Sequence, residues 1–106
     1  MSIPDITVQE LEALIAAEAD VFILDVRNPD EYEICNIKGH LIPFKDLPSR
    51  LQELDPEQHI VVHCHAGGRS SRATEYLLQQ GFKKVQNLRG GITAWANEID
   101  PKMKKY

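Results

Sequence analysis

The stretch at residues 59–70, HIVVHCHAGGRS, joins an apolar run to a glycine-rich loop and the start of a helix. The run HIVVHC has the length and apolar centre of a strand that is covered on both faces of a parallel sheet. The pattern SSRATEYLLQQ that follows is helical, and Gly81 stands where a C-cap glycine belongs. The stretch therefore predicts a strand, a loop and a helix in succession, with Cys64 where the strand ends.

The same alternation of strand and helix extends over the rest of the chain. Strands are predicted at 5–7, 21–26, 59–64 and 83–88, and helices after Thr7, at 29–34, 48–54, 70–80 and 90–99. Two of the helix starts carry capping boxes, Thr7 with Glu10 and Asn28 with Glu31. Such alternation indicates a mostly parallel sheet with helices on both faces, whose sites lie beyond the carboxyl ends of the strands.

Composition limits the classes of protein to consider. The 106 residues are 42% hydrophobic and 26% charged, with a net charge of -4, so we expect one domain over 1–106 and no nucleic-acid partner. No apolar stretch has membrane-spanning length and no signal-peptide pattern begins the chain, so we expect a cytoplasmic protein without a membrane partner. The two cysteines are too few for a disulfide scaffold. Residues 102–106 are expected to be a frayed basic tail.

Residues 64–70, CHAGGRS, combine a nucleophile with features that bind negative charge. A free cysteine has a pKa of about 8.5 and attacks only as the thiolate. Amide groups at the helix start supply positive potential, and the two glycines allow the backbone to turn successive N–H groups inward. Arg69 is a permanent cation able to fold back over the loop, and Ser70 is expected to cap the helix. The substrate-binding residues predicted around catalytic Cys64 are His65, Ala66, Gly67, Gly68, Arg69 and Ser70.

The spacing within the loop bears on its chemistry. The stretch resembles that of cysteine phosphatases, but their pattern is Cys-x5-Arg, whereas four residues separate Cys64 from Arg69 here. A shorter ring of amides has a narrower mouth, which suits one sulfur atom bonded to the cysteine better than a tetrahedral phosphate. The four-residue spacing between Cys64 and Arg69 therefore favours sulfur chemistry over phosphate chemistry. A phosphatase or arsenate reductase that uses the same nucleophile is the alternative.

Three stretches resemble signatures of the single-domain rhodaneses, in the family's order. They are ILDVRNPDEYE at 23–33, VVHCHAGGRSSRA at 61–73 and LRGGITAW at 88–95, and the resemblance covers nearly the whole chain. It implies a rhodanese-like α/β fold, with a five-stranded mostly parallel sheet flanked by helices on both faces. It also places Asp25 and Arg27 beside the strand end of Cys64, as supporting residues that brace the loop through hydrogen bonds.

The resemblance implies a sulfurtransferase of the thiosulfate:cyanide class. Cys64 would take a sulfane sulfur from thiosulfate or a low-molecular-weight persulfide and pass it to a thiophilic acceptor, including a protein thiol or a sulfur-carrier protein. This chemistry needs no metal and no organic cofactor, and such small domains act as monomers or weak dimers. A non-catalytic binding module is the third class considered, although such modules often lack the cysteine that this chain keeps.

The chain departs from the family pattern at two places. Where relatives commonly have GHIPGA, this chain has CNIKGH at 35–40, so that Cys35 and Asn36 replace a glycine and a histidine. Many relatives carry arginine or lysine directly after the catalytic cysteine, where this chain has His65, which is only partly charged near neutral pH. We therefore expect thiosulfate to bind weakly and a persulfide to be the better donor. Cys35 is expected to be a half-buried apolar residue rather than a resolving cysteine.

The sequence predicts no metal site, although His63, Cys64 and His65 are consecutive. Neighbouring side chains of a strand point to opposite faces, and no second cluster of ligands follows. His63 is instead expected to pack or hydrogen-bond behind the loop. Trp95 is expected to fill the core beneath the last helix.

Overall fold

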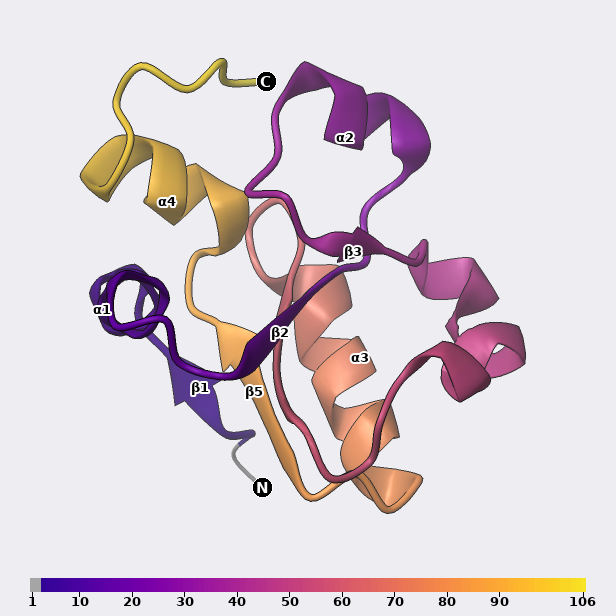
Figure 1. The fold of residues 1–106 in the computed structure, drawn as a ribbon. Coiled ribbons are helices and arrows are strands. Elements are labelled where there is room, and N and C mark those ends of the chain that lie inside the picture. The colour runs from indigo at the N-terminus through magenta and orange to yellow at the C-terminus, as the bar shows by residue number, and fades with distance from the viewer. Residues whose placement is uncertain (1–2) are drawn as a thin grey trace.

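Five parallel strands form one sheet in the order β1-β5-β4-β2-β3, with helices on both faces (Figure 1). This computed structural model describes residues 3–106. In chain order the elements are β1 (Asp5–Ile6), α1 (Val8–Ala16), β2 (Val21–Asp25), α2 (Pro29–Ile34), β3 (His40–Leu41), the 3₁₀ helix η1 (Phe44–Glu53), β4 (His59–His63), α3 (Gly68–Gln79), β5 (Lys84–Leu88) and α4 (Gly91–Glu98). The predicted five-stranded parallel sheet with flanking helices is confirmed. Among the described residues, no helix has the length and apolar character needed to cross a membrane.

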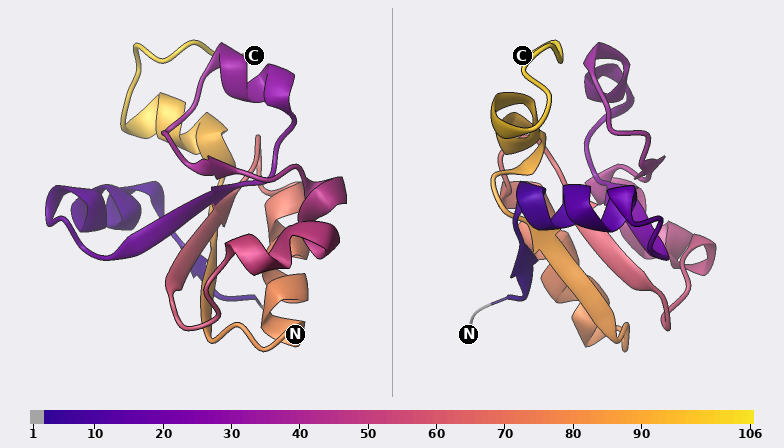
Figure 2. Two further views of the ribbon diagram at one scale, coloured as in Figure 1. Left: turned by 45° about the vertical axis from the view of Figure 1, so that its right-hand side comes forward. Right: turned by 60° about the vertical axis from the view of Figure 1, so that its left-hand side comes forward.

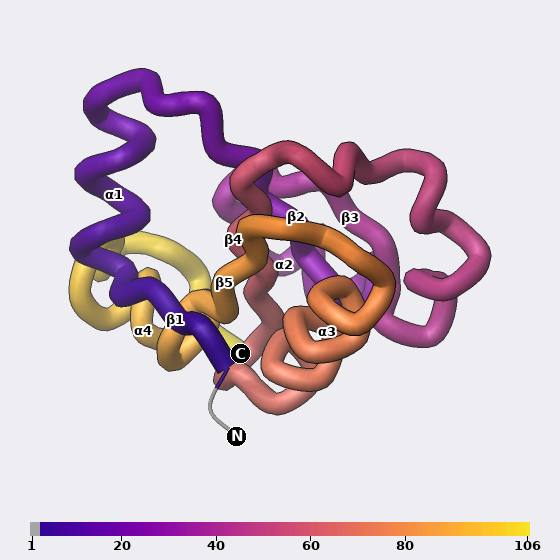
Figure 3. The backbone as a smooth tube through the Cα atoms, turned by 90° about the horizontal axis from the view of Figure 1, so that it is seen from below, coloured from indigo at the N-terminus to yellow at the C-terminus, as the bar shows by residue number. Residues whose placement is uncertain are grey.

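The two faces of the sheet carry separate apolar clusters, because side chains alternate along each strand. On β4, Ile60 and Val62 belong to the cluster beneath α3 and η1, whereas Val61 belongs to the cluster beneath α1 and α4. All three are fully buried, and burial of each such side chain stabilises the fold by about 2 kcal/mol. Figures 2 and 3 show the same layering, with α1 and α4 on one side of the strands and α3 on the other.

Local signals in the sequence set several helix boundaries. Before α1, the N–H of Glu10 donates to Thr7 Oγ1 at 3.1 Å, and the N–H of Thr7 donates to Glu10 Oε1 at 2.9 Å. Helix α2 begins at Pro29, and the N–H of the preceding residue donates to Glu31 Oε1 at 3.0 Å. Gly81 follows α3 with a φ of +93°, a conformation that favours glycine. These predicted starts and the predicted C-cap glycine are confirmed.

The segment between β2 and β4 differs from the prediction. The sequence predicts a helix at 48–54, but a 3₁₀ helix already begins at Phe44. Pro48 lies inside it and has no amide hydrogen to donate, and Arg50 has non-helical φ and ψ, so no continuous α-helix forms. The position of strand β3 was not predicted, because its two residues lie in a segment, 35–44, that has no clear periodic pattern.

The pairing of β2 with β4 brings the two predicted site segments together. Asp25 stands opposite His63 in the register of this pair, so Cys64 follows beside the carboxyl end of β2. Helix α4 begins directly beyond β5 and reaches the same place, where the N–H of Ile92 donates to the carbonyl oxygen of Cys64 at 3.0 Å. The site is therefore built where the strands end, as expected for a parallel sheet.

Candidate active site

Cys64 lies at the bottom of the loop, facing the start of α3. It continues the face of β4 that carries Ile60 and Val62, and it is only 1% exposed. The N–H groups of Gly67 and Ser70 lie 3.1 Å and 3.4 Å from its Sγ, and Ser70 Oγ lies 3.3 Å from it. These donors converge because Gly67 has a φ of +120°, which turns the loop sharply into α3. A thiolate at this position is therefore met by several donors at once.

These donors decide the ionisation of Cys64. Burial of the sulfur opposes ionisation and acts to raise its pKa. The hydroxyl and N–H of Ser70, with the N–H groups of Gly67 and Arg69, outweigh burial and hold the pKa of Cys64 below its usual value. The N-terminus of α3 carries the equivalent of roughly half a positive charge, which also favours the thiolate form of Cys64. The arrangement favours a nucleophilic thiolate.

Ser70 has a different role from the one that the sequence predicts. The N-cap of α3 is Gly67, so Ser70 lies within the first turn of the helix and the expected capping role is wrong. Its hydroxyl donates to Oδ1 of Asn87 on β5 at 2.6 Å and lies within reach of Cys64 Sγ. Because a serine hydroxyl has a single proton, Ser70 can turn that proton from Asn87 to the sulfur when Cys64 ionises.

Arg69 pairs with Glu31 of α2 instead of folding back over the loop. Its Nη1 and Nη2 lie 2.7 Å and 2.9 Å from the two carboxylate oxygens of Glu31, which forms a bidentate ion pair. This pair raises the pKa of Arg69 further, so its charge is permanent. The expectation that Arg69 covers the loop with a free cation is therefore corrected: its charge is shared with a carboxylate that α2 supplies.

The Arg69–Glu31 pair predicts an acid-sensitive contribution to stability. Arg69 lowers the pKa of Glu31 from 4.5 to about 2. Partial burial of the carboxylate acts against this shift, whereas the N–H of Asn28 and the hydroxyl of Tyr106 act in the same direction as Arg69. Because the pKa is lower in the folded chain than in the unfolded chain, the contribution is present above pH 4.5 and lost as the pH falls towards 2. We expect wild type to unfold at higher urea than Glu31→Gln near neutral pH, and this difference to shrink over that range. A difference independent of pH would contradict the assignment.

Asp25 and Arg27 form a fully buried ion pair. Both side chains are 0% exposed, and Arg27 Nη2 lies 2.7 Å from Asp25 Oδ2 and 2.8 Å from the carbonyl oxygen of Cys35. Arg27 Nη1 also donates to the carbonyl oxygen of Glu31 at 3.3 Å. These two hydrogen bonds hold the end of α2, and Arg27 Nη1 also donates at 3.0 Å to the hydroxyl of Tyr106, whose ring stacks on His65 of the loop. The expectation that the pair braces the loop through hydrogen bonds stays a prediction: within residues 3–106 neither side chain bonds residues 64–70 directly, and Arg27 reaches the loop through Tyr106.

His63 lies behind the loop and is fully buried, as expected. Its Nε2 lies 3.6 Å from Asp25 Oδ2 and has no hydrogen-bond partner among the described residues. Burial lowers the pKa of His63, although the Asp25 carboxylate acts in the opposite direction. His63 is therefore a neutral packing residue near physiological pH.

His65 connects the loop to two distant parts of the chain. Its carbonyl oxygen accepts hydrogen bonds from the Thr93 hydroxyl at 2.9 Å and from the Thr93 N–H at 3.1 Å. Its Nε2 donates to the carbonyl oxygen of Tyr106 at 3.0 Å, and the two rings stack with centroids 4.3 Å apart. Residues 102–106 are expected from the sequence to be frayed, but Tyr106 at the end of that segment is packed against the loop. Aromatic stacking and hydrogen bonding together explain the difference.

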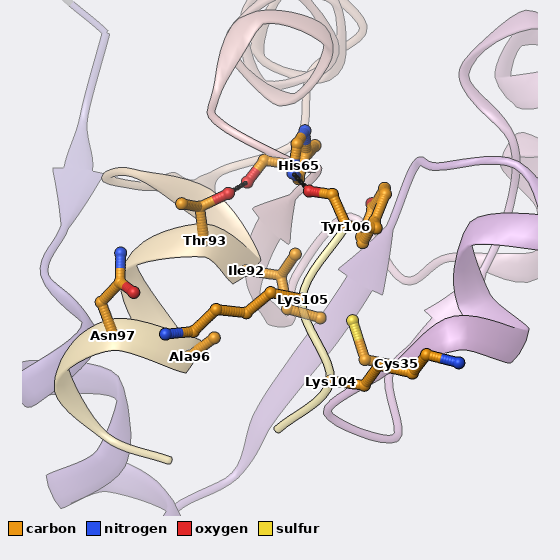
Figure 4. A pocket seen from close by; sticks show the side chains of 9 residues that line it. All are labelled: Cys35, His65, Ile92, Thr93, Ala96, Asn97, Lys104, Lys105 and Tyr106. Atoms are coloured by element: carbon orange, nitrogen blue, oxygen red, sulfur yellow. Dashed lines mark hydrogen bonds between the residues drawn. The ribbon is translucent and has the colours of Figure 1, made fainter. Parts of the chain in front are cut away.

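A cavity of about 210 Å³ lies beside the loop, between α4 and the C-terminal segment (Figure 4). Its lining residues are Cys35, His65, Ile92, Thr93, Ala96, Asn97, Lys104, Lys105 and Tyr106. Cys35 is half-buried there, with its Sγ 3.9 Å from Arg27 Nη1.

Asn36, the other unusual residue of this segment, accepts a hydrogen bond from the N–H of Lys38 at 2.9 Å and so supports the positive φ of Lys38. Within the described residues no group of histidine, cysteine and acidic side chains could hold a metal ion.

The sequence singles out Cys64 and its loop but gives no indication of two residues that contact the loop. Asn87 pairs in register with Val62, but it follows another amide, Gln86, in a strand with only two apolar residues, so no signal in the sequence singles it out. Tyr106 left no signal, because a single aromatic residue in a basic segment has no pattern. Glu31 was identified only as part of a capping box, and its pairing with Arg69 joins residues that the sequence keeps far apart.

The site thus consists of a buried cysteine in a loop of converging amides, between a parallel strand and a helix of an α/β domain. The chain belongs to the rhodanese-like domain family, whose model matches residues 7–98. It is similar to a protein of Allochromatium vinosum named "Sulfurtransferase", with 39% identity over 93 residues and 87% of each chain covered.

Solved structures of related proteins have the same fold. A rhodanese-like domain protein from Staphylococcus aureus superposes with a TM-score of 0.83 at 30% identity, covering 92% of this chain and 95% of that one. A thiosulfate sulfurtransferase from Pseudomonas aeruginosa superposes with a TM-score of 0.81 at 34% identity, and this chain spans 90% of its own length but only 19% of that protein.

Proposed function

We propose that this chain is a rhodanese-type sulfurtransferase in which Cys64 carries a sulfane sulfur atom as a persulfide. The observation that carries the proposal is the set of donors around Cys64 Sγ, with the N–H of Gly67 at 3.1 Å and the hydroxyl of Ser70 at 3.3 Å. They favour the thiolate, which is the form that attacks sulfur. Membership of the rhodanese-like family and the similarity to a protein named "Sulfurtransferase" support the same chemistry.

The first half of the reaction loads the cysteine. The Cys64 thiolate attacks the outer sulfur of thiosulfate, a new sulfur–sulfur bond forms, and the sulfur–sulfur bond of thiosulfate breaks as sulfite leaves with the electron pair. The product is a persulfide anion on Cys64. Its negative charge is stabilised by the loop amides and the N-terminus of α3, where no reorganisation is needed because the donors are already in place. The hydroxyl of Ser70 can donate its single proton in a hydrogen bond to the negatively charged sulfur.

The second half passes the sulfur to an acceptor. A thiophilic nucleophile, either cyanide or a thiolate, attacks the outer sulfur of the persulfide, and the Cys64 thiolate leaves with the electron pair. With cyanide the product is thiocyanate, and with a thiolate it is a new persulfide. We propose a persulfide as the better natural donor, because Arg69 is paired with Glu31 and His65 with Tyr106, which leaves little free positive charge for a dianion.

The proposal is tested by the mass of the protein after incubation with thiosulfate and removal of small molecules. We expect the mass of one added sulfur atom on the peptide that contains Cys64, and its removal by cyanide with release of thiocyanate. Glutathione persulfide replaces thiosulfate in a parallel sample, because a weak interaction with thiosulfate is expected. No added sulfur from either donor, together with hydrolysis of an aryl phosphate, would overturn the proposal in favour of a phosphatase.

A further inference from the structure

The side chain of Tyr106 joins two charged pairs of the site to the catalytic loop. Its hydroxyl donates to Glu31 Oε2 at 2.8 Å and accepts from Arg27 Nη1 at 3.0 Å. Its ring stacks on His65, the residue directly after Cys64, with centroids 4.3 Å apart and planes 23° apart. One residue thus contacts α2, the strand end of β2 and the loop at the same time.

These contacts hold the C-terminal segment, residues 99–106, beside the loop and α2. Figures 1 and 2 show the segment leaving α4, turning back above that helix and ending beside α2. In Figure 4 the Tyr106 ring lies beside His65, and both residues line the cavity that borders the loop. The segment therefore lies against His65, the residue directly after Cys64, whose own exposure is 1%.

Tyr106 supplies the polar side-chain attachment of this segment. Within residues 3–106, the side chains of Lys102, Lys104 and Lys105 form no ion pair or hydrogen bond, and all three are exposed. Tyr106 itself stays 41% exposed, so the attachment can open without unfolding the core. Two hydrogen bonds to charged groups and one aromatic stack make the closed arrangement favoured by about tenfold or more.

We propose that Tyr106 determines which substrates reach Cys64: a small anionic donor enters while Tyr106 is in place, and a bulky thiol acceptor enters only after Tyr106 has moved away. This inference rests on the proposed function, since it names the size of substrate that the same site admits. Tyr106 acts here as a positioning residue, because its contacts are with His65, Arg27 and Glu31 and not with the reacting sulfur.

The experiment compares two reagents that have the same reactive group and different sizes. Reduced protein is treated with N-ethylmaleimide or fluorescein maleimide, and modification of the Cys64 peptide is followed by mass spectrometry, which separates it from the Cys35 peptide. We expect Tyr106→Ala to raise the rate with fluorescein maleimide about tenfold and the rate with N-ethylmaleimide less than about twofold. Tyr106→Phe, which keeps the stacked ring and loses both hydroxyl contacts, is expected to give an intermediate rate with the larger reagent.

Lys102→Ala is the matched control, because it changes the same segment without removing a side-chain contact, and both rates are expected to stay at the wild-type value. Equal acceleration with both reagents in Tyr106→Ala would overturn the inference, since it would indicate a change in thiolate reactivity instead of access. Unchanged rates with both reagents would also overturn it. Neither measurement requires sulfur transfer, so the inference can fail while the proposed function stands, and the proposed function can fail separately in the persulfide assay.

Discussion

Cys64→Ser is expected to lower kcat/KM for sulfur transfer by at least about 1,000-fold, to the level of the uncatalysed reaction. Serine preserves the position of the side chain beside Gly67 and Ser70 but cannot form a persulfide, because an oxygen atom replaces the sulfur that becomes bonded to the transferred atom. The loss therefore has a chemical and not a structural origin. The measurement is the rate of thiocyanate formation from thiosulfate and cyanide.

Cys35→Ser is the matched control for this prediction. Cys35 lines the cavity beside the loop, and its Sγ makes only a long contact of 3.9 Å with Arg27 Nη1, so we expect kcat/KM to stay within about twofold of wild type. The thermal midpoints of both variants are measured alongside to show that each is folded. If Cys64→Ser kept more than a few per cent of the wild-type rate, or if Cys35→Ser lost as much, Cys64 would not be the sulfur carrier.

The order of most elements and the loop that follows Cys64 could be predicted because their signals are local. Apolar runs of strand length mark β2 and β4, and the capping box of Thr7 with Glu10 marks the start of α1 within four consecutive positions. The loop is equally local, since its glycines and its cysteine lie in one uninterrupted stretch. Each of these features depends on neighbours in the sequence, which a sequence displays directly.

The electrostatic surroundings of the loop could not be predicted, because they depend on which distant side chains meet where the strands end. Arg69 was expected to face the donor, yet Glu31, thirty-eight positions away along the chain, binds both of its terminal nitrogens. The register of β4 with β5 places Asn87 within reach of Ser70, and a turn of positive φ at Gly67 starts α3 early enough to exclude Ser70 as its cap. Small changes of backbone angle thus decide which polar groups face Cys64.

Gly91→Ala is expected to lower the free energy of unfolding by about 2–4 kcal/mol. A Cβ at this position would lie 2.6 Å from the carbonyl oxygen of His65 and 2.7 Å from that of Cys64, and Gly91 has a φ of +58°. Both opposing atoms are backbone, so no rotation of a side chain relieves the overlap. The substitution must therefore move the loop that follows Cys64 away from α4 or distort the start of that helix.

The activity of Gly91→Ala is expected to fall further than its stability alone would require. The Ile92 N–H holds the carbonyl oxygen of Cys64 at 3.0 Å, so displacement of α4 also displaces the sulfur from its donors. A misplacement of the sulfur by about 1 Å would lower kcat about 100-fold even in molecules that remain folded. Stability is measured by urea unfolding and kcat by thiocyanate formation at a temperature where the variant is folded.

Gly68→Ala is the matched control for Gly91→Ala, because it also replaces a glycine beside the loop but at a position where the added side chain is not crowded. Gly68 begins α3, its φ is not positive, and a Cβ there meets no atom within 4 Å, so we expect a change in unfolding free energy of no more than about 0.5–1 kcal/mol, with alanine favoured by helix propensity. If Gly91→Ala were as stable as Gly68→Ala, the prediction would be contradicted, since the loop would then accommodate the added side chain with no loss of unfolding free energy. Since the loop carbonyls bind α4 directly, we expect the opposite: the packing of α4 fixes the position of Cys64, and Gly91 is required because only a residue without a side chain lets the helix approach this closely.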